Sequence, residues 1–189
     1  MAEVLLFHHA GGQTPGFKEF AGELRDAGHT VHAPDLFGGR TFTDLREGVA
    51  YAQETGFDNI IERGVAAADS LPREIVYAGF SLGCMPAEKL AIRRLGARGV
   101  VLMSGFAPPS YFGSWPEEVP VQIHIMESDH WVTEEDLPAA RQFADRNSNA
   151  ELYLYPGDQH LFAEKGPQFE PNAAKQLRQR VFEFLARVD

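Results

Sequence analysis

The segment Ile75–Gly96 reads IVYAGFSLGCMPAEKLAIRRLG and combines an apolar run, a glycine-rich turn and a helical pattern. Its first part, Ile75–Phe80, is short, apolar and partly β-branched, which favours a strand, whereas Met85–Leu95 carries helical spacing. The turn between them, Gly79–Gly83, reads GFSLG and is a G-x-S-x-G pattern. The segment therefore predicts a strand that passes through a tight turn directly into a helix.

The same alternation of strand and helix runs along the whole chain. Apolar runs predict strands at Val4–His8, His29–Ala33, Ile75–Phe80, Val100–Ser104, Val121–Glu127 and Leu152–Tyr155. Helical spacing predicts helices over Phe17–Ala27, Thr43–Glu54, Asn59–Ser70, Met85–Leu95, Thr133–Arg146 and Ala173–Arg187. No linker or repeat interrupts this pattern, so we expect one α/β domain over residues 1–189, with a doubly wound, mostly parallel sheet.

Composition excludes several classes of function. The net charge of -10, from 27 acidic and 17 basic residues, repels phosphate backbones and anionic lipid surfaces, so we expect neither a nucleic-acid nor a membrane partner. The short apolar run near the N-terminus has no basic lead and fits neither a signal peptide nor a membrane span. A single cysteine excludes a disulfide framework. We therefore expect a cytoplasmic protein.

Ser81 is the candidate nucleophile, because it lies at the centre of the G-x-S-x-G turn between strand and helix. Glycines at the flanking positions remove side chains that would collide in so tight a turn. A serine hydroxyl is a weak nucleophile and needs a base, which in turn needs an orienting carboxylate. The alternative nucleophile is Cys84, although a free cysteine is usually a small buried hydrophobe.

The orienting acid and the base are predicted in two later loops. In α/β-hydrolases the order along the chain is Ser, then Asp or Glu, then His. Asp129 follows the strand VQIHIM and His160 follows the strand ELYLYP, and such loops converge at one edge of a parallel sheet. Asp136 and His130 are the alternatives, but Asp136 fits the first turn of a helix and His130 adjoins the acid itself.

Taken together, these motifs resemble the dienelactone hydrolase family of α/β-hydrolases. The landmarks are LLFHHAGGQTPG, AGHTVHAPDLFGGRTF, the turn GFSLGC, the acid loop MESDHWV and the histidine loop YPGDQHLF, which together span nearly the whole chain. The resemblance implies an α/β-hydrolase fold without a large cap domain. It also implies hydrolysis of carboxylic esters or lactones through a covalent acyl-enzyme.

Two positions depart from the family pattern. Dienelactone hydrolases proper carry Cys where this chain has Ser81, and a Glu in the first loop that engages the resting thiol; here Ala10 or a neighbour stands in its place. Glu164 lies near the position where some members use an Arg to bind a substrate carboxylate. The first departure is consistent with a serine nucleophile, and the second argues against dienelactone itself as the substrate.

The remaining site residues follow from the same fold. The oxyanion hole is expected from the backbone N–H of Leu82, the residue after the nucleophile, and from Gly11 or Ala10 in the first loop. The substrate pocket is expected to hold a small, neutral, partly hydrophobic molecule, and its candidate residues are His9, Phe106, Trp115, Trp131 and Glu164.

The sequence favours a serine esterase or lactonase that needs no cofactor and no metal. If the first strand extends through them, the adjacent His8 and His9 point to opposite faces and do not bind one ion. The alternatives are a thioesterase or small peptidase with the same triad, and a ligand-binding homologue with little turnover.

Overall fold

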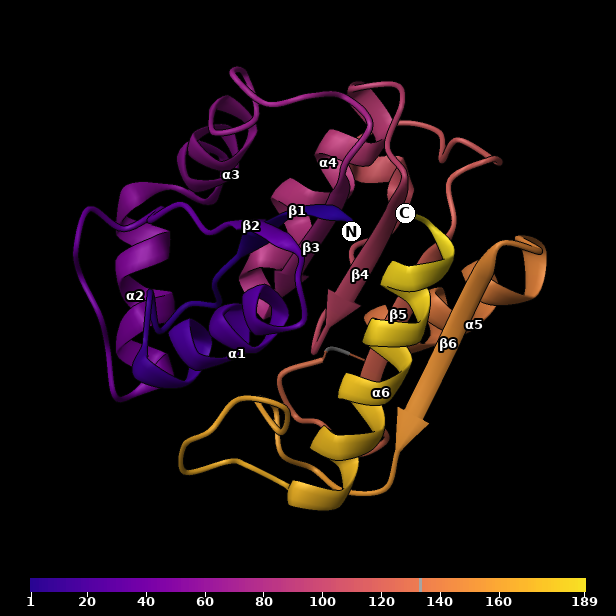
Figure 1. Cartoon of the computed structure of the whole chain (residues 1–189). Helices are drawn as coiled ribbons and strands as arrows, with labels where there is room; N and C mark the ends of the chain where they lie inside the picture. The colour runs from indigo at the N-terminus through magenta and orange to yellow at the C-terminus, as the bar shows by residue number, and fades with distance from the viewer. Residues whose placement is uncertain (133) are drawn as a thin grey trace.

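The computed structural model, which describes residues 1–132 and 134–189, contains one sheet of six strands (Figure 1). The strands are all parallel and follow the order β2-β1-β3-β4-β5-β6. Their bounds are Glu3–Phe7 (β1), Thr30–His32 (β2), Val76–Phe80 (β3), Gly99–Met103 (β4), Val121–Met126 (β5) and Ala150–Tyr155 (β6). Every strand predicted from the sequence is present, with ends shifted by a few residues.

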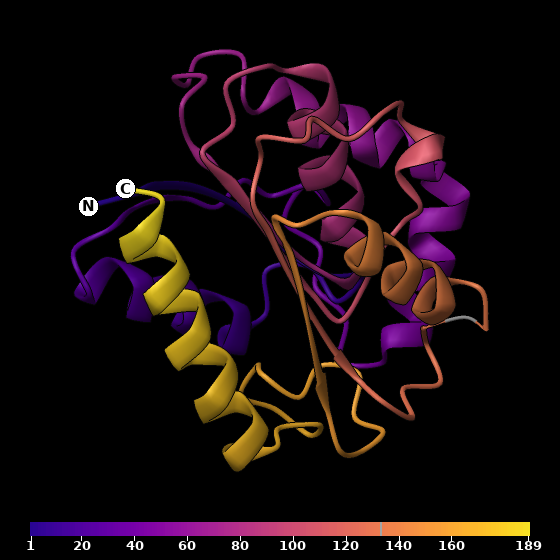
Figure 2. The same ribbon diagram turned by 90° about the vertical axis from the view of Figure 1, so that its right-hand side faces the viewer.

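Helices connect the strands and cover both faces of the sheet. Their bounds are Pro15–Asp26 (α1), Leu45–Thr55 (α2), Phe57–Ala66 (α3), Cys84–Arg93 (α4), Asp136–Arg146 (α5) and Pro171–Arg187 (α6). Figure 2 shows α1 and α6 on one side of the sheet and the other helices on the opposite side. The doubly wound parallel architecture predicted from the sequence is therefore confirmed.

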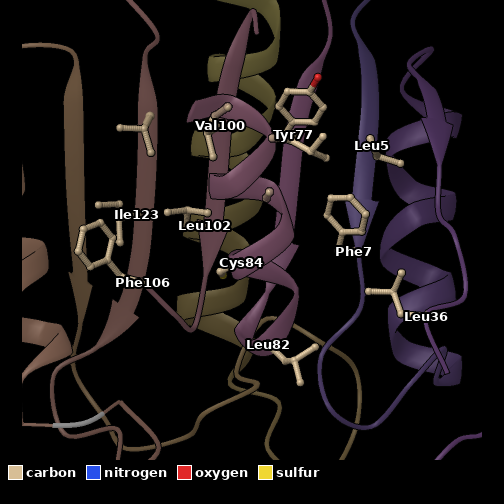
Figure 3. Close-up of a cluster of buried hydrophobic side chains, with 14 of the residues drawn as sticks. Leu5, Phe7, Leu36, Tyr77, Leu82, Cys84, Val100, Leu102, Phe106 and Ile123 are labelled. Carbon is tan, nitrogen blue, oxygen red and sulfur yellow. The ribbon is translucent and has the colours of Figure 1, made fainter. Parts of the chain in front are cut away.

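Two separate apolar clusters hold these layers together, because successive residues of each strand point to opposite faces. Leu5 and Phe7 of β1 pack with buried residues of α2, α3, α4 and α5, and Figure 3 shows part of this cluster. Val4 and Leu6 of the same strand pack with buried residues of α1 and α6. Burial on both faces explains why the strands are continuous apolar runs.

Local chemistry sets the helix ends that differ from the prediction. Thr14 accepts a hydrogen bond from the backbone N–H of Phe17 (3.1 Å) and Pro15 follows it, so α1 begins two residues earlier than the apolar pattern alone indicates. Gly56, with φ of 89°, separates α2 from α3. The expected helix Thr133–Arg146 begins at a residue outside the described part of the chain, and α5 starts at Asp136.

None of the helices in residues 1–132 and 134–189 combines the length and the apolar character that crossing a bilayer requires. The loops that leave the carboxyl ends of β1, β3, β4, β5 and β6 carry the residues singled out by the sequence, and these loops form the candidate site.

Candidate active site

Ser81 lies in strained backbone at the point where β3 ends. Its φ is 48°, in the left-handed region that side chains rarely adopt, and a 3₁₀ turn of Ser81–Gly83 leads directly into α4. A Cβ on Gly79 would lie 2.1 Å from the Gly83 carbonyl oxygen, and one on Gly83 would lie 2.6 Å from the Phe7 carbonyl oxygen. Glycine is therefore required on both sides of the turn.

Ser81, His160 and Asp129 form one hydrogen-bonded chain. Nε2 of His160 is 2.7 Å from Oγ of Ser81, and Nδ1 is 2.7 Å from Oδ2 of Asp129. The other carboxylate oxygen of Asp129 accepts the backbone N–H of Trp131 at 2.9 Å. Since a carboxylate only accepts, Nδ1 carries the proton and Nε2 has a lone pair for the serine hydroxyl.

The alternative residues occupy different surroundings. Cys84 is buried, and its Sγ lies 3.3 Å from the Gly79 carbonyl oxygen and 3.6 Å from that of Met103. Burial, and secondarily the nearby Glu88, raises the pKa of this thiol well above its usual value. His130 is exposed, and Asp136 is the first residue of α5. The chain of contacts to Ser81 thus runs through Asp129 and His160.

The loop of residues 8–12, here called the first loop, follows β1 beside the nucleophile turn. The backbone N–H of Gly11 donates to Nδ1 of His9 at 2.9 Å. Within the described residues, Ala10 N–H has no hydrogen bond. Leu82 is the second residue of the 3₁₀ turn, so no carbonyl group within the helix can accept a hydrogen bond from its N–H. Of the two first-loop residues proposed for the oxyanion hole, Ala10 is therefore the one with a free donor.

Two pockets lie at this edge of the sheet. The first, of about 210 Å³, contains Ser81 and His160, and aromatic residues contribute to its wall. These aromatic residues are Phe106, Tyr111 and Trp131. Tyr111 and Trp131 are also among the exposed large hydrophobic side chains. An apolar surface therefore leads to the serine.

The second pocket, of about 340 Å³, is lined by His9, Gly11 and Glu164, with apolar walls that include Phe42, Leu45 and Leu161. Leu161 directly follows His160 in the chain, so the two pockets approach each other at the histidine loop.

The five candidate pocket residues are divided between these pockets. Phe106 and Trp131 line the first, and His9 and Glu164 line the second. Trp115 lines neither; its ring packs edge-on against Phe143 at 5.3 Å, and its Nε1 donates to the Val119 carbonyl oxygen at 3.1 Å.

Sequence reasoning missed Ser104, the residue just after β4. Its φ is 59°, its side chain is buried in the wall of the first pocket, and Oγ has no hydrogen-bond partner within residues 1–132 and 134–189. The sequence does contain a signal for this residue: Ser104 and Gly105 follow directly on the apolar strand, at the sheet edge where the other site residues lie.

A buried carboxyl group, that of Glu88, lies on α4, one helical turn after Cys84. Oε1 of Glu88 accepts the backbone N–H of Ala107 at 3.0 Å, whereas Oε2 has no hydrogen-bond partner in the described chain. Burial raises the pKa of this carboxyl well above its usual value, the Ala107 hydrogen bond opposes this, and the charge of Asp136 adds to it. Glu88 is therefore held in its neutral form over a wider pH range than an exposed carboxyl.

Comparison with known proteins gives a consistent family and fold. The family model described as the dienelactone hydrolase family matches residues 1–189. A search of curated proteins finds no match. A solved structure named m3DLH is 19% identical, with a TM-score of 0.79 over 99% of this chain and 86% of that one.

Two further structures have similar folds. A dienelactone hydrolase-like promiscuous phosphotriesterase from metagenomic libraries is 16% identical, with a TM-score of 0.75 over 100% of this chain and 87% of that one. Esterase 2 of Thermogutta terrifontis, phosphonylated by cyclosarin, is 18% identical, with a TM-score of 0.66 over 99% of this chain and 83% of that one. At these identities the likeness shows a shared α/β-hydrolase fold.

Proposed function

The chain belongs to the dienelactone hydrolase family, and from that premise we propose that it is a serine hydrolase that cleaves a carboxylic ester or lactone. The observation that carries this proposal is the position of the His160 ring between two partners. Its Nε2 is 2.7 Å from Ser81 Oγ, and its Nδ1 is 2.7 Å from Asp129 Oδ2. A base held between a hydroxyl and a carboxylate is the arrangement that activates serine for attack on a carbonyl.

The proposed reaction has two halves. Ser81 Oγ attacks the carbonyl carbon while His160 Nε2 takes its proton, and the negative oxygen of the tetrahedral intermediate is bound by the N–H groups of Leu82 and Ala10. His160 then gives the proton to the leaving oxygen, which leaves an acyl-enzyme. A water molecule repeats the sequence at the acyl carbonyl and returns the proton to Ser81. Asp129 holds the required tautomer of His160 and stabilises the imidazolium.

The proposed partner is a small, neutral and partly hydrophobic ester or lactone. Its support is the aromatic wall of the first pocket around Ser81 and the carboxylate of Glu164 in the second. The proposed steps use only groups of this chain and water. The likeness to an esterase that is phosphonylated by cyclosarin also supports an ester-cleaving enzyme.

A panel of short p-nitrophenyl esters, thioesters and peptide anilides tests the reaction class. We expect the esters to be turned over fastest and mass spectrometry of quenched reactions to find the acyl group on Ser81. Faster cleavage of thioesters or anilides would favour the thioesterase or peptidase alternative. Tight binding of the esters without turnover or acylation would favour a ligand-binding homologue.

A further inference from the structure

We infer that His8 and His9 are positioning residues that clamp the first loop so that Ala10 N–H faces the reacting carbonyl as an oxyanion donor. This inference rests on the proposed function, since it concerns the oxyanion hole of the same reaction. Its basis is that the two histidines hold two successive peptide groups of the loop by their side chains.

His8 holds the peptide group that carries the donor itself. The carbonyl oxygen of His9 and the N–H of Ala10 belong to one planar unit and point in opposite directions. That oxygen accepts hydrogen bonds from Nδ1 of His8 at 2.8 Å and from the N–H of Gly12 at 3.0 Å. Anchoring the carbonyl fixes the direction of Ala10 N–H, which itself has no hydrogen bond in the described chain.

The ring of His8 is itself fixed. Nε2 accepts the backbone N–H of Leu36 at 2.9 Å, so Nδ1 is the protonated nitrogen that donates to the loop. The ring is fully buried and packs edge-on against Phe37 at 4.9 Å and Phe17 at 5.9 Å. Burial lowers the pKa of this imidazole, which favours the neutral form with one donor and one acceptor.

His9 holds the next peptide group, between Ala10 and Gly11. The N–H of Gly11 donates to Nδ1 of His9, and the carbonyl oxygen of Ala10 lies against α2 at Gly48. A Cβ on Gly48 would lie 1.9 Å from that oxygen, so α2 can pack this tightly against the loop only because residue 48 is glycine. The peptide group is thus held at both ends.

Glu164 sets the tautomer that His9 needs. Because Nδ1 accepts from Gly11, the ring proton is on Nε2, which lies 2.6 Å from Oε2 of Glu164. This contact is not a well-aligned hydrogen bond, and neither atom has another partner within the described residues. Oε1 of Glu164 accepts the hydroxyl of Thr14, which also caps α1. The carboxylate of Glu164, 155 residues away in the sequence, therefore lies against the protonated nitrogen of His9 and favours by its charge the tautomer whose Nδ1 accepts from the loop.

Two substitutions of His9 separate its hydrogen bond from its bulk. His9→Asn keeps an acceptor close to the position of Nδ1, whereas His9→Leu removes it. We expect His9→Leu to lower kcat by about 10²-fold with little change in KM, the scale for losing one oxyanion donor, and His9→Asn to regain most of that loss. His32→Leu, which removes a His–Glu contact of 2.8 Å at the edge strand β2, is the matched control and leaves kcat unchanged.

A readout specific to the oxyanion hole excludes a merely structural effect. A trifluoromethyl ketone forms a tetrahedral adduct with serine whose oxygen occupies the hole, so its inhibition constant should rise by the same factor by which kcat falls. His8→Phe, which keeps an aromatic ring between Phe17 and Phe37, should show the same parallel loss. If His9→Leu does not fold, Glu164→Leu compared with Glu164→Gln repeats the test, because only Gln keeps an acceptor for Nε2–H.

The outcomes separate the inference from the proposed function. Equal kcat values for the Asn and Leu variants of His9 would overturn the positioning role of the histidines. A change in KM alone, with an unchanged inhibition constant of the ketone, would overturn it as well. Either result would still be compatible with the proposed serine hydrolase. Full turnover by Ser81→Ala would instead refute the proposed function itself. A parallel loss in kcat and ketone binding that the Asn variant restores would support both.

Discussion

Oγ of Ser81 lies 2.7 Å from Nε2 of His160, whereas Sγ of Cys84, three residues later, is buried 3.3 Å from the Gly79 carbonyl oxygen. The turn thus places the serine in the site and the cysteine in the apolar core, in the cluster drawn in part in Figure 3, which also contains Leu102 and Val100. Burial raises the pKa of the thiol, so the reactive thiolate is disfavoured.

The first prediction follows from this difference. Ser81→Ala should abolish esterase activity and labelling by a fluorophosphonate, whereas Cys84→Ala should keep most of the activity and lose about 1 kcal/mol of stability from the core. Kinetics on a p-nitrophenyl ester and chemical unfolding of both variants check this. Cys84 would be the nucleophile if its alanine variant were inactive while Ser81→Ala remained active.

The second prediction concerns the acid. Asp129→Asn presents an amide to Nδ1 of His160 and favours the wrong tautomer, so kcat should fall by on the order of 10⁴-fold, as the same change does in serine proteases. Asp136→Asn, which changes another carboxylate beside the first pocket, should have a much smaller effect. Measured kcat values that rank the two aspartates in the opposite order would contradict the assignment of Asp129.

The strands and the edge of the sheet were predictable because their signals are local. Parallel strands buried on both faces are apolar runs, and each run ends where a polar loop begins. This pattern predicts that Ser81, Asp129 and His160 lie at one edge of the sheet. Helix ends are harder to predict, because a cap such as that of Thr14 on α1 depends on a single hydroxyl group and leaves no periodic pattern in the sequence.

The contacts between distant loops were not predictable from the sequence. Nothing local connects His9 with Glu164, or Gly48 with the carbonyl oxygen of Ala10, since each pair meets only after the sheet has formed. The position of Trp115, which was expected in the pocket, could not be predicted for a similar reason. An aromatic ring is equally suited to a pocket wall and to the core, and here it packs against Phe143.

The third prediction concerns substrate charge. Glu164 lines the second pocket, so we expect a higher kcat/KM for a neutral ester than for a carboxylate-bearing analogue of similar size. Two like charges 4 Å apart repel by about 4 kcal/mol at an effective dielectric of 20 and by about 1 kcal/mol in water. The preference should therefore weaken at high salt if the pocket is wet.

Glu164→Gln tests this with little change in volume. An arginine at this position is a poorer test, because Glu164 is buried and the longer side chain would change volume as well as charge. The ratio of kcat/KM for the neutral and anionic esters should move toward one in the Gln variant. A wild-type protein that already prefers the anion, or a ratio unaffected by the substitution, would contradict a repulsive role for Glu164.

The fourth prediction concerns Glu88, whose raised pKa makes stability depend on pH. Below the ordinary pKa of about 4.5 both folded and unfolded states are protonated and no penalty arises. As pH rises above that value the unfolded chain ionises first, so Glu88 lowers the free energy of unfolding by about 1.4 kcal/mol per pH unit until its folded pKa is reached.

The variant Glu88→Gln tests this prediction, because it cannot ionise and its Oε1 can still accept Ala107 N–H. Its stability relative to wild type should therefore increase from pH 4.5 to 6.5 in urea unfolding. Glu74→Gln, at an exposed carboxylate, is the control for the loss of one surface charge. Parallel pH curves for wild type and Glu88→Gln would show that this carboxyl titrates as an ordinary exposed group.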